Sequence, residues 1–98
     1  MNYYMVDINL HREQSQNFKE LIPKQKSFFH RLMHEGKILD YALSLDKSKI
    51  WISFSARSEK EVSDIISKFP LIDFFEVDVH PLAFQNRMNV LIPKVSLN

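Results

Sequence analysis

The sequence contains no cysteine and only one glycine among its 98 residues. The lack of cysteine excludes disulfides, thiolate metal sites and a cysteine nucleophile, and it fits a reducing cytoplasm. A single glycine excludes the glycine-rich loops that bind phosphate groups. No apolar stretch approaches the roughly 20 residues of a membrane-spanning helix, and the N-terminus lacks the pattern of a signal peptide. We therefore expect a cytoplasmic protein that does not bind a membrane.

Neither sign of charge dominates the chain. Its 13 basic and 12 acidic residues leave a net charge of +1. Without a broad basic field the protein is not expected to bind nucleic acid. The length predicts one domain with a thin hydrophobic core, which an interface with a second copy would help to stabilise.

The hydrophobic periodicity changes along the chain between two and about 3.6 residues. Alternating segments at 3–10, 38–45, 50–56 and 72–81 predict four strands, and segments at 15–35 and 58–69 predict two amphipathic helices. Gly36 suits the end of the first helix, whereas Pro23 inside it predicts a break or a kink. The order β-α-β-β-α-β is typical of a ferredoxin-like α+β fold, a four-stranded antiparallel sheet with two helices on one face. We expect this domain to span residues 1–82, with an apolar tail at 83–98 that packs on a partner subunit.

In such a fold one set of alternating strand residues faces the helices, and the other set forms a second face. The second face combines aromatic rings with acids, which suggests a surface that meets another sheet and keeps a polar cavity. Three of its residues share one strand and are the candidate acid/base catalysts: Glu76, Asp78 and His80. The candidate lining of a substrate pocket comprises Tyr3, Met5, Asp7, Asp40, Trp51, Ser53 and Phe74.

Two readings of the acidic strand stay open. A strand face outside the core is often a solvated or interfacial polar ladder without chemistry. Alternatively, an acid enclosed between aromatic rings and a second acid suits a general base near neutral pH. A hard cation could also bind to an oxygen-rich cluster formed by Asp7, Glu76, Asp78 and His80. Because nothing in the sequence fixes their geometry, no metal site is predicted.

One segment, Phe69-Pro70-Leu71-Ile72-Asp73-Phe74-Phe75-Glu76-Val77-Asp78-Val79, resembles the Pro-Leu turn and acidic strand of the muconolactone isomerase family. The resemblance extends to Leu32, to His34-Glu35-Gly36, to Phe54 and to Ser58, and it covers about two-thirds of the chain. The family's second strand is rich in Trp, Arg and His, whereas here Ile38-Leu39-Asp40-Tyr41-Ala42-Leu43 stands in its place.

The resemblance implies a homodimer, a dimeric α+β barrel in which two sheets face each other, and it allows a larger ring of dimers. It also implies an isomerase of small unsaturated lactones or carboxylates that transfers a proton by acid/base chemistry without a cofactor. Such a reaction needs a base and a group that stabilises the enolate. The alternative is a protein of the same fold without catalysis, which binds a small ligand or serves a structural, oligomeric role.

Overall fold

A computed structural model describes residues 1–11 and 15–86 of the chain. Its elements, in chain order, are β1 Asn2–Leu10, α1 Gln16–His34, β2 Ile38–Leu43, β3 Lys49–Ala56, α2 Glu59–Ile66, the short 3-10 helix η1 Ile72–Phe74 and β4 Phe75–Pro81. Neither α1 nor α2 is long and apolar enough to cross a membrane. Most of the predicted tail, residues 87–98, lies outside the described residues.

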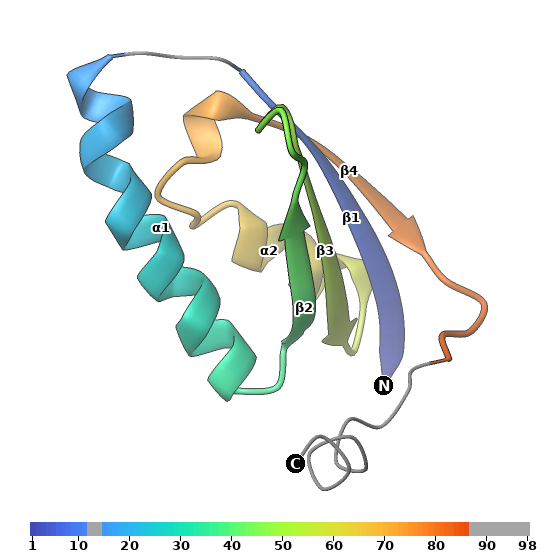
Figure 1. Cartoon of the computed structure of the whole chain (residues 1–98). Coiled ribbons are helices and arrows are strands. Elements are labelled where there is room, and N and C mark those ends of the chain that lie inside the picture. The colour runs from blue at the N-terminus through green and yellow to red at the C-terminus, as the bar shows by residue number, and fades with distance from the viewer. Residues whose placement is uncertain (12–14, 87–98) are drawn as a thin grey trace, which may run out of the picture.

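The four strands form one antiparallel sheet in the order β2-β3-β1-β4, so β1 and β3 are central and β2 and β4 are edges. Both helices cover the same face of this sheet (Figure 1). The predicted order of elements and the antiparallel, two-layer arrangement are therefore confirmed. The alternation of apolar and polar residues predicts this arrangement because the described helices leave the second face of the sheet uncovered.

The hydrophobic core lies between the sheet and the two helices. The central strands contribute Val6, Ile8, Ile52 and Phe54, which are completely buried. Phe69, in the loop after α2, is also buried, and its ring packs edge-on against the rings of Phe28, Phe29 and Phe75. These aromatic contacts tie α1, the loop and β4 into one core.

Helix α1 begins and ends as its sequence indicates. The Ser15 hydroxyl accepts a hydrogen bond from the backbone N–H of Phe18 at 3.1 Å and caps the N-terminus. Gly36 has a φ of +78°, the left-handed conformation that follows many helix ends. Of the two alternatives predicted at Pro23, a break or a kink, the break is wrong, because the helix continues through this residue. Pro23 and Lys19 are both exposed, so water can satisfy the Lys19 carbonyl that loses its helical partner.

The edge strand β2 departs from simple alternation. Ile38 pairs with Phe54 and Asp40 pairs with Ser53, so β2 has one residue more than β3 between these two pairs. This bulge turns Ile38 toward the helices, where it is buried, although alternation placed it opposite to Tyr41 and Leu43. The strand ends at Leu43, and Leu45, which was predicted to belong to it, is fully exposed in the turn before β3.

Helix α2 begins with a side-chain cap. The Ser58 hydroxyl accepts a hydrogen bond from the backbone N–H of Glu61 at 3.2 Å. In return Glu61 Oε1 accepts a hydrogen bond from the backbone N–H of Arg57 at 2.8 Å. This bond, together with the charges of Arg57 and Lys37, lowers the pKa of Glu61 below its usual 4.5.

A lowered pKa in the folded state makes the contribution of Glu61 to stability depend on pH. Its stabilisation is fully present above the usual carboxyl pKa of 4.5 and disappears as the pH falls through the lowered value. We therefore expect Glu61→Gln to unfold at lower urea concentration than the wild type at pH 7. The two proteins should converge in acid, well below pH 4.5. Equal urea midpoints at pH 7 would contradict this role of the charge.

Candidate functional site

The sheet face that the helices leave uncovered, here called the open face, carries most of the residues predicted to form the site. Cross-strand pairing places Asp40, Ser53, Met5 and His80 in one row from β2 to β4. The next row contains Ala42, Trp51, Asp7 and Asp78. Tyr3 pairs with Ser55 beside the first row. The open face is thus a contiguous surface of rings, acids and one histidine.

The three candidate acid/base residues lie along the edge strand β4. Glu76, Asp78 and His80 are all exposed in the single chain. Glu76 lies 3.5 Å from the imidazole of His11, the residue that follows β1. Asp78 is opposite Asp7, which places two acids on neighbouring strands. The structure therefore brings the three residues onto one surface, and a partner would be needed to enclose them.

The centre of the open face is partly covered by the segment that follows β4. Gln85 Nε2 donates a hydrogen bond to Ser53 Oγ at 3.3 Å, and Ser53 is 2% exposed although it faces away from the helices. Asp7 Oδ1 forms an ion pair with Lys49 Nζ at 2.9 Å, but in an orientation that gives no hydrogen bond within the described part of the chain. Trp51 remains 39% exposed beside them.

Phe74 does not belong to the open face, so its predicted position was wrong. The chain from Ile72 to Phe74 forms the 3-10 helix η1 rather than the start of β4, which changes the direction of its side chains. The Phe74 ring packs edge-on against Phe18 of α1, with 5.0 Å between ring centroids. Phe74 therefore supports the helix side of the molecule.

The acids and histidines do not gather around a common point. Among residues 1–11 and 15–86, no group of three His, Asp or Glu side chains is arranged to hold a metal ion. Two acids of the open face instead form ion pairs with a nearby base, Asp7 with Lys49 and Glu76 with His11.

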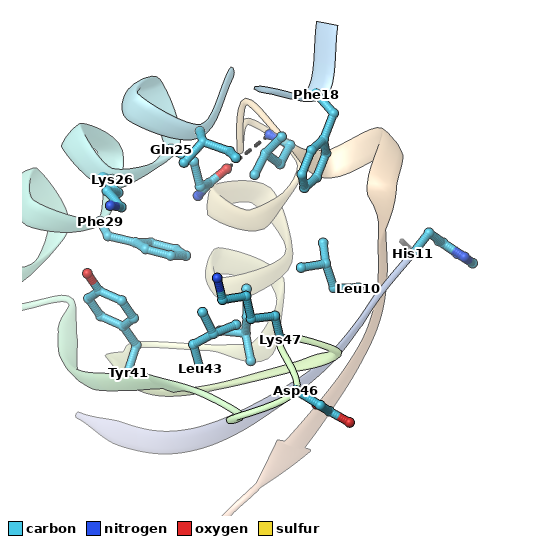
Figure 2. Close-up of a pocket in the computed structure, with 13 residues that line it drawn as sticks. Leu10, His11, Phe18, Gln25, Lys26, Phe29, Tyr41, Leu43, Asp46 and Lys47 are labelled. Atoms are coloured by element: carbon cyan, nitrogen blue, oxygen red, sulfur yellow. Dashed lines mark hydrogen bonds between the residues drawn. The ribbon is translucent and has the colours of Figure 1, made fainter. Parts of the chain in front are cut away.

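A cavity of about 550 Å³ lies on the helix side of the sheet, between α1 and the turn that joins β2 to β3. We call it the α1 cleft (Figure 2). Its walls are mainly apolar and include Leu10, Phe18, Ile22, Phe29, Leu43 and Ile50. Cavities of about 300–1,000 Å³ with apolar walls and a few polar groups are typical of sites for small molecules.

Gln25 is the one buried polar residue of α1 among the described residues, and it lines the α1 cleft. Its Oε1 accepts a hydrogen bond from the backbone N–H of Leu71 at 3.0 Å, which holds the amide in one orientation. Its Nε2 is shielded from solvent and has no hydrogen-bond partner among the described residues. Leaving such a donor unpaired costs about 1–3 kcal/mol. Buried donors without a partner are rare in native proteins, so the Gln25 Nε2 group is unusual.

Two lysines and a tyrosine add polar groups to the cleft: Lys26, Lys47 and Tyr41. Lys47 has a φ of +64°, an unusual conformation for a residue other than glycine. Figure 2 shows its amine pointing into the cleft, whereas the carboxylate of the neighbouring Asp46 points away. That carboxylate accepts hydrogen bonds from Ser44 and Ser48. The lining of the cleft therefore includes several hydrogen-bond donors, and the amine of Lys47 is directed into it.

Reasoning from the sequence directed attention to the open face and missed the α1 cleft. One signal was available, because Gln25 lies four residues from both Leu21 and Phe29 and thus on the apolar stripe of α1. A polar residue in that stripe needs a partner. The position of Lys47 gave no signal, since Asp46-Lys47-Ser48 reads as an ordinary polar turn.

The arrangement defines a ferredoxin-like α+β domain with a donor-lined cleft beneath its first helix. The family model of muconolactone delta-isomerase matches residues 3–88, and the chain belongs to this family. No curated protein matches the chain.

Solved structures show the same fold in proteins of low sequence identity. A muconolactone isomerase is 16% identical, covers 88% of this chain and 93% of its own, and has a TM-score of 0.74. A 5-chloro-2-hydroxyhydroquinone dehydrochlorinase from Burkholderia phenoliruptrix, in complex with 2,5-dihydroxybenzoquinone, is 15% identical over 84% of this chain and 95% of its own, with a TM-score of 0.59. An uncharacterised protein from Thermotoga maritima is 13% identical over 83% and 96%, with a TM-score of 0.55.

Proposed function

We propose that this chain is an isomerase of small unsaturated lactones or carboxylates, which it binds in the α1 cleft and converts by proton transfer without a cofactor. The observation that carries this proposal is the cleft itself, where apolar walls surround several hydrogen-bond donors. A small ring would lie against Phe29 and Ile22, and an anionic group would be attracted to the lysines. Membership of the muconolactone delta-isomerase family supports the class of reaction.

The reaction moves one proton and one double bond. A base removes a proton from the carbon beside the lactone carbonyl, and the electron pair moves onto the carbonyl oxygen to give an enolate. A proton then returns to a carbon further along the conjugated system. Tyr41 and Lys26, which both line the cleft, are the donors that we assign to the enolate oxygen.

For the base we assign His11, with Glu76 as its partner. His11 stands at the rim of the cleft, and its imidazole lies 3.5 Å from the Glu76 carboxylate. A carboxylate at this distance can orient the imidazole for proton transfer. In Figure 2 the ring points away from the cleft, so it would turn toward a bound substrate. The sequence-based assignment differs, since it gives the proton transfer to Glu76, Asp78 and His80 on the open face.

The two assignments predict different results in one assay. Isomerisation and deuterium uptake by butenolides with a carboxylate side chain can be followed by proton NMR in D₂O. We expect His11→Gln and Glu76→Gln to lower kcat about 100-fold, because general acid/base catalysis typically contributes this much or more. Asp78→Asn and His80→Gln, on the same strand, are the matched controls and should retain activity.

Each other outcome of this assay is informative. A large loss in Asp78→Asn and His80→Gln with an active His11→Gln would move the reaction to the open face. Binding of these compounds without any isomerisation by the wild type would favour the non-catalytic alternative. The absence of both binding and turnover would refute the proposal.

We also propose that two copies associate through their open faces, as in a dimeric α+β barrel. Support comes from the partly exposed rings of Trp51 and Tyr3 on this surface. Two shielded oxygens of the same surface, Asp7 Oδ1 and Gln85 Oε1, have no hydrogen-bond partner among residues 1–11 and 15–86, although Asp7 Oδ1 forms an ion pair with Lys49. Aromatic residues are enriched at the centres of protein interfaces. A second sheet would bring partners to these groups and would enclose Asp78 and His80.

A further inference from the structure

We propose that Gln25 and Lys47 form a carboxylate-binding site at the inner end of the α1 cleft. The inference rests on the proposed function in one respect, namely that the cleft is where the ligand binds. It adds the chemical group that the cleft selects and the two residues that select it.

The Gln25 amide has a fixed orientation. Its Oε1 accepts the backbone N–H of Leu71, so exchanging the positions of oxygen and nitrogen would place two donors against each other. The Nε2 group must therefore point away from Leu71, and Figure 2 shows it directed into the cleft. Gln25 consequently presents a donor to the cleft, and its ligand has to supply an acceptor.

No described residue supplies that acceptor. Gln25 is 3% exposed, and Nε2 has no partner among residues 1–11 and 15–86. If the only role of the Gln25 side chain were to accept the backbone N–H of Leu71, a side chain with an acceptor and no N–H group would be sufficient. Such a side chain would leave no buried donor without a partner. The donor that is left over indicates a bound acceptor.

The nearby amine of Lys47 indicates that this acceptor is an anion. Figure 2 shows the Lys47 amine and the Gln25 amide nitrogen both pointing toward the middle of the cleft, from opposite walls. Lys47 points to this place from a left-handed backbone conformation. This conformation costs free energy for any residue other than glycine, because the side chain crowds the backbone. The acidic neighbour Asp46 is turned outward and bonded to Ser44 and Ser48. An ammonium and an amide on a common point suit a carboxylate.

The ligand must also open the site, because Nε2 is shielded from solvent in the free chain. Lys26 and Lys47 are exposed residues of the cleft with long flexible stems, so their side chains can move with little loss. The remaining apolar walls, Phe29 and Ile22 among them, would contact the body of the ligand. The expected ligand is therefore a small carboxylate with an apolar ring.

The test measures binding of phenylacetate, which cannot undergo the proposed isomerisation, by isothermal titration calorimetry. Phenylethylammonium, a cation of similar size, is the control ligand and should not bind. We expect Gln25→Glu to weaken phenylacetate binding about 10-fold or more, since a donor to a charged group is replaced by an acceptor. Gln25→Glu is well matched, because it retains an oxygen for the backbone N–H of Leu71.

Two further variants make the result independent of the folding of Gln25→Glu. Lys47→Asn removes the ammonium but keeps a residue that tolerates a positive φ, and it should weaken binding several-fold. Lys24→Asn changes the same charge at an exposed position of α1 that does not line the cleft, and it should bind as the wild type does.

The inference is overturned if the wild type does not bind phenylacetate, or if Gln25→Glu and Lys47→Asn bind it unchanged. A purely structural role of Gln25 predicts normal binding by Gln25→Glu and loss only in Gln25→Met, which removes the bond to Leu71 as well. Failure of the proposed isomerase activity is a separate outcome, because phenylacetate binding does not require turnover.

Discussion

Replacing Phe69 with alanine should lower the free energy of unfolding by about 3–5 kcal/mol, which is the usual loss for a buried phenylalanine. Phe69 is 2% exposed, and its ring centroid lies 5.3 Å from that of Phe29 and 5.5 Å from that of Phe28. The Phe75 ring completes the group at 6.2 Å. Removing Phe69 thus leaves three rings without their common neighbour.

The loss should be large relative to the total stability of a short chain. A 98-residue domain buries a limited core, and domains in general are stable by about 5–15 kcal/mol. Urea denaturation followed by far-ultraviolet circular dichroism measures the change. Leu45→Ala, at a fully exposed position, is the control and should change stability by less than about 0.5 kcal/mol. A Phe69→Ala variant as stable as Leu45→Ala would show that the aromatic cluster does not hold the core together.

Replacing Met5 with aspartate should abolish the association of two chains through their open faces. Met5 lies on the central strand β1, between Ser53 on one side and His80 on the other. In a sheet-to-sheet dimer each copy would bury a new carboxylate in a surface that already contains Asp7 and Asp78. The dissociation constant should rise about 100-fold or more, since a buried unpaired charge costs several kcal/mol.

Size-exclusion chromatography with light scattering would measure the molar mass across a range of concentrations. Asn9→Asp is the matched control, because it adds the same charge to the same strand but at an exposed position near its end. We expect Asn9→Asp to remain dimeric like the wild type. A wild type that is monomeric at every concentration, or a dimeric Met5→Asp, would exclude association through this face.

Local sequence patterns were enough to predict the sheet because its two faces differ so strongly. Val6, Ile8 and Ile52 are completely buried, and residues that are more exposed, such as Asp7 and Trp51, alternate with them. The errors arose where the backbone departs from regular pleating. The bulge between Ile38 and Asp40 and the 3-10 helix before Phe75 each reverse the side on which a residue lies. Neither irregularity has a marker such as glycine, so alternation alone could not reveal them.

The candidate site was harder to predict than the fold. Alternation along a strand determines which residues share one face of the sheet. Nine of the ten candidate residues lie on the open face as predicted, and Phe74 is the exception. A cavity, in contrast, depends on how far a helix stands from its sheet and on which side chains fill the space. The contact of Gln25 with Leu71 joins residues 46 positions apart, and no pattern within α1 specifies it.

The position of the sole tryptophan has a practical consequence. Trp51 projects from the sheet on the side opposite the α1 cleft, so the sheet itself separates its indole from anything bound beneath α1. Its intrinsic fluorescence should accordingly change when two open faces associate. It should not change when a ligand binds in the α1 cleft. The molecule thus carries its own optical reporter for one of its two surfaces, and the events on the two sides of the sheet can be recorded separately.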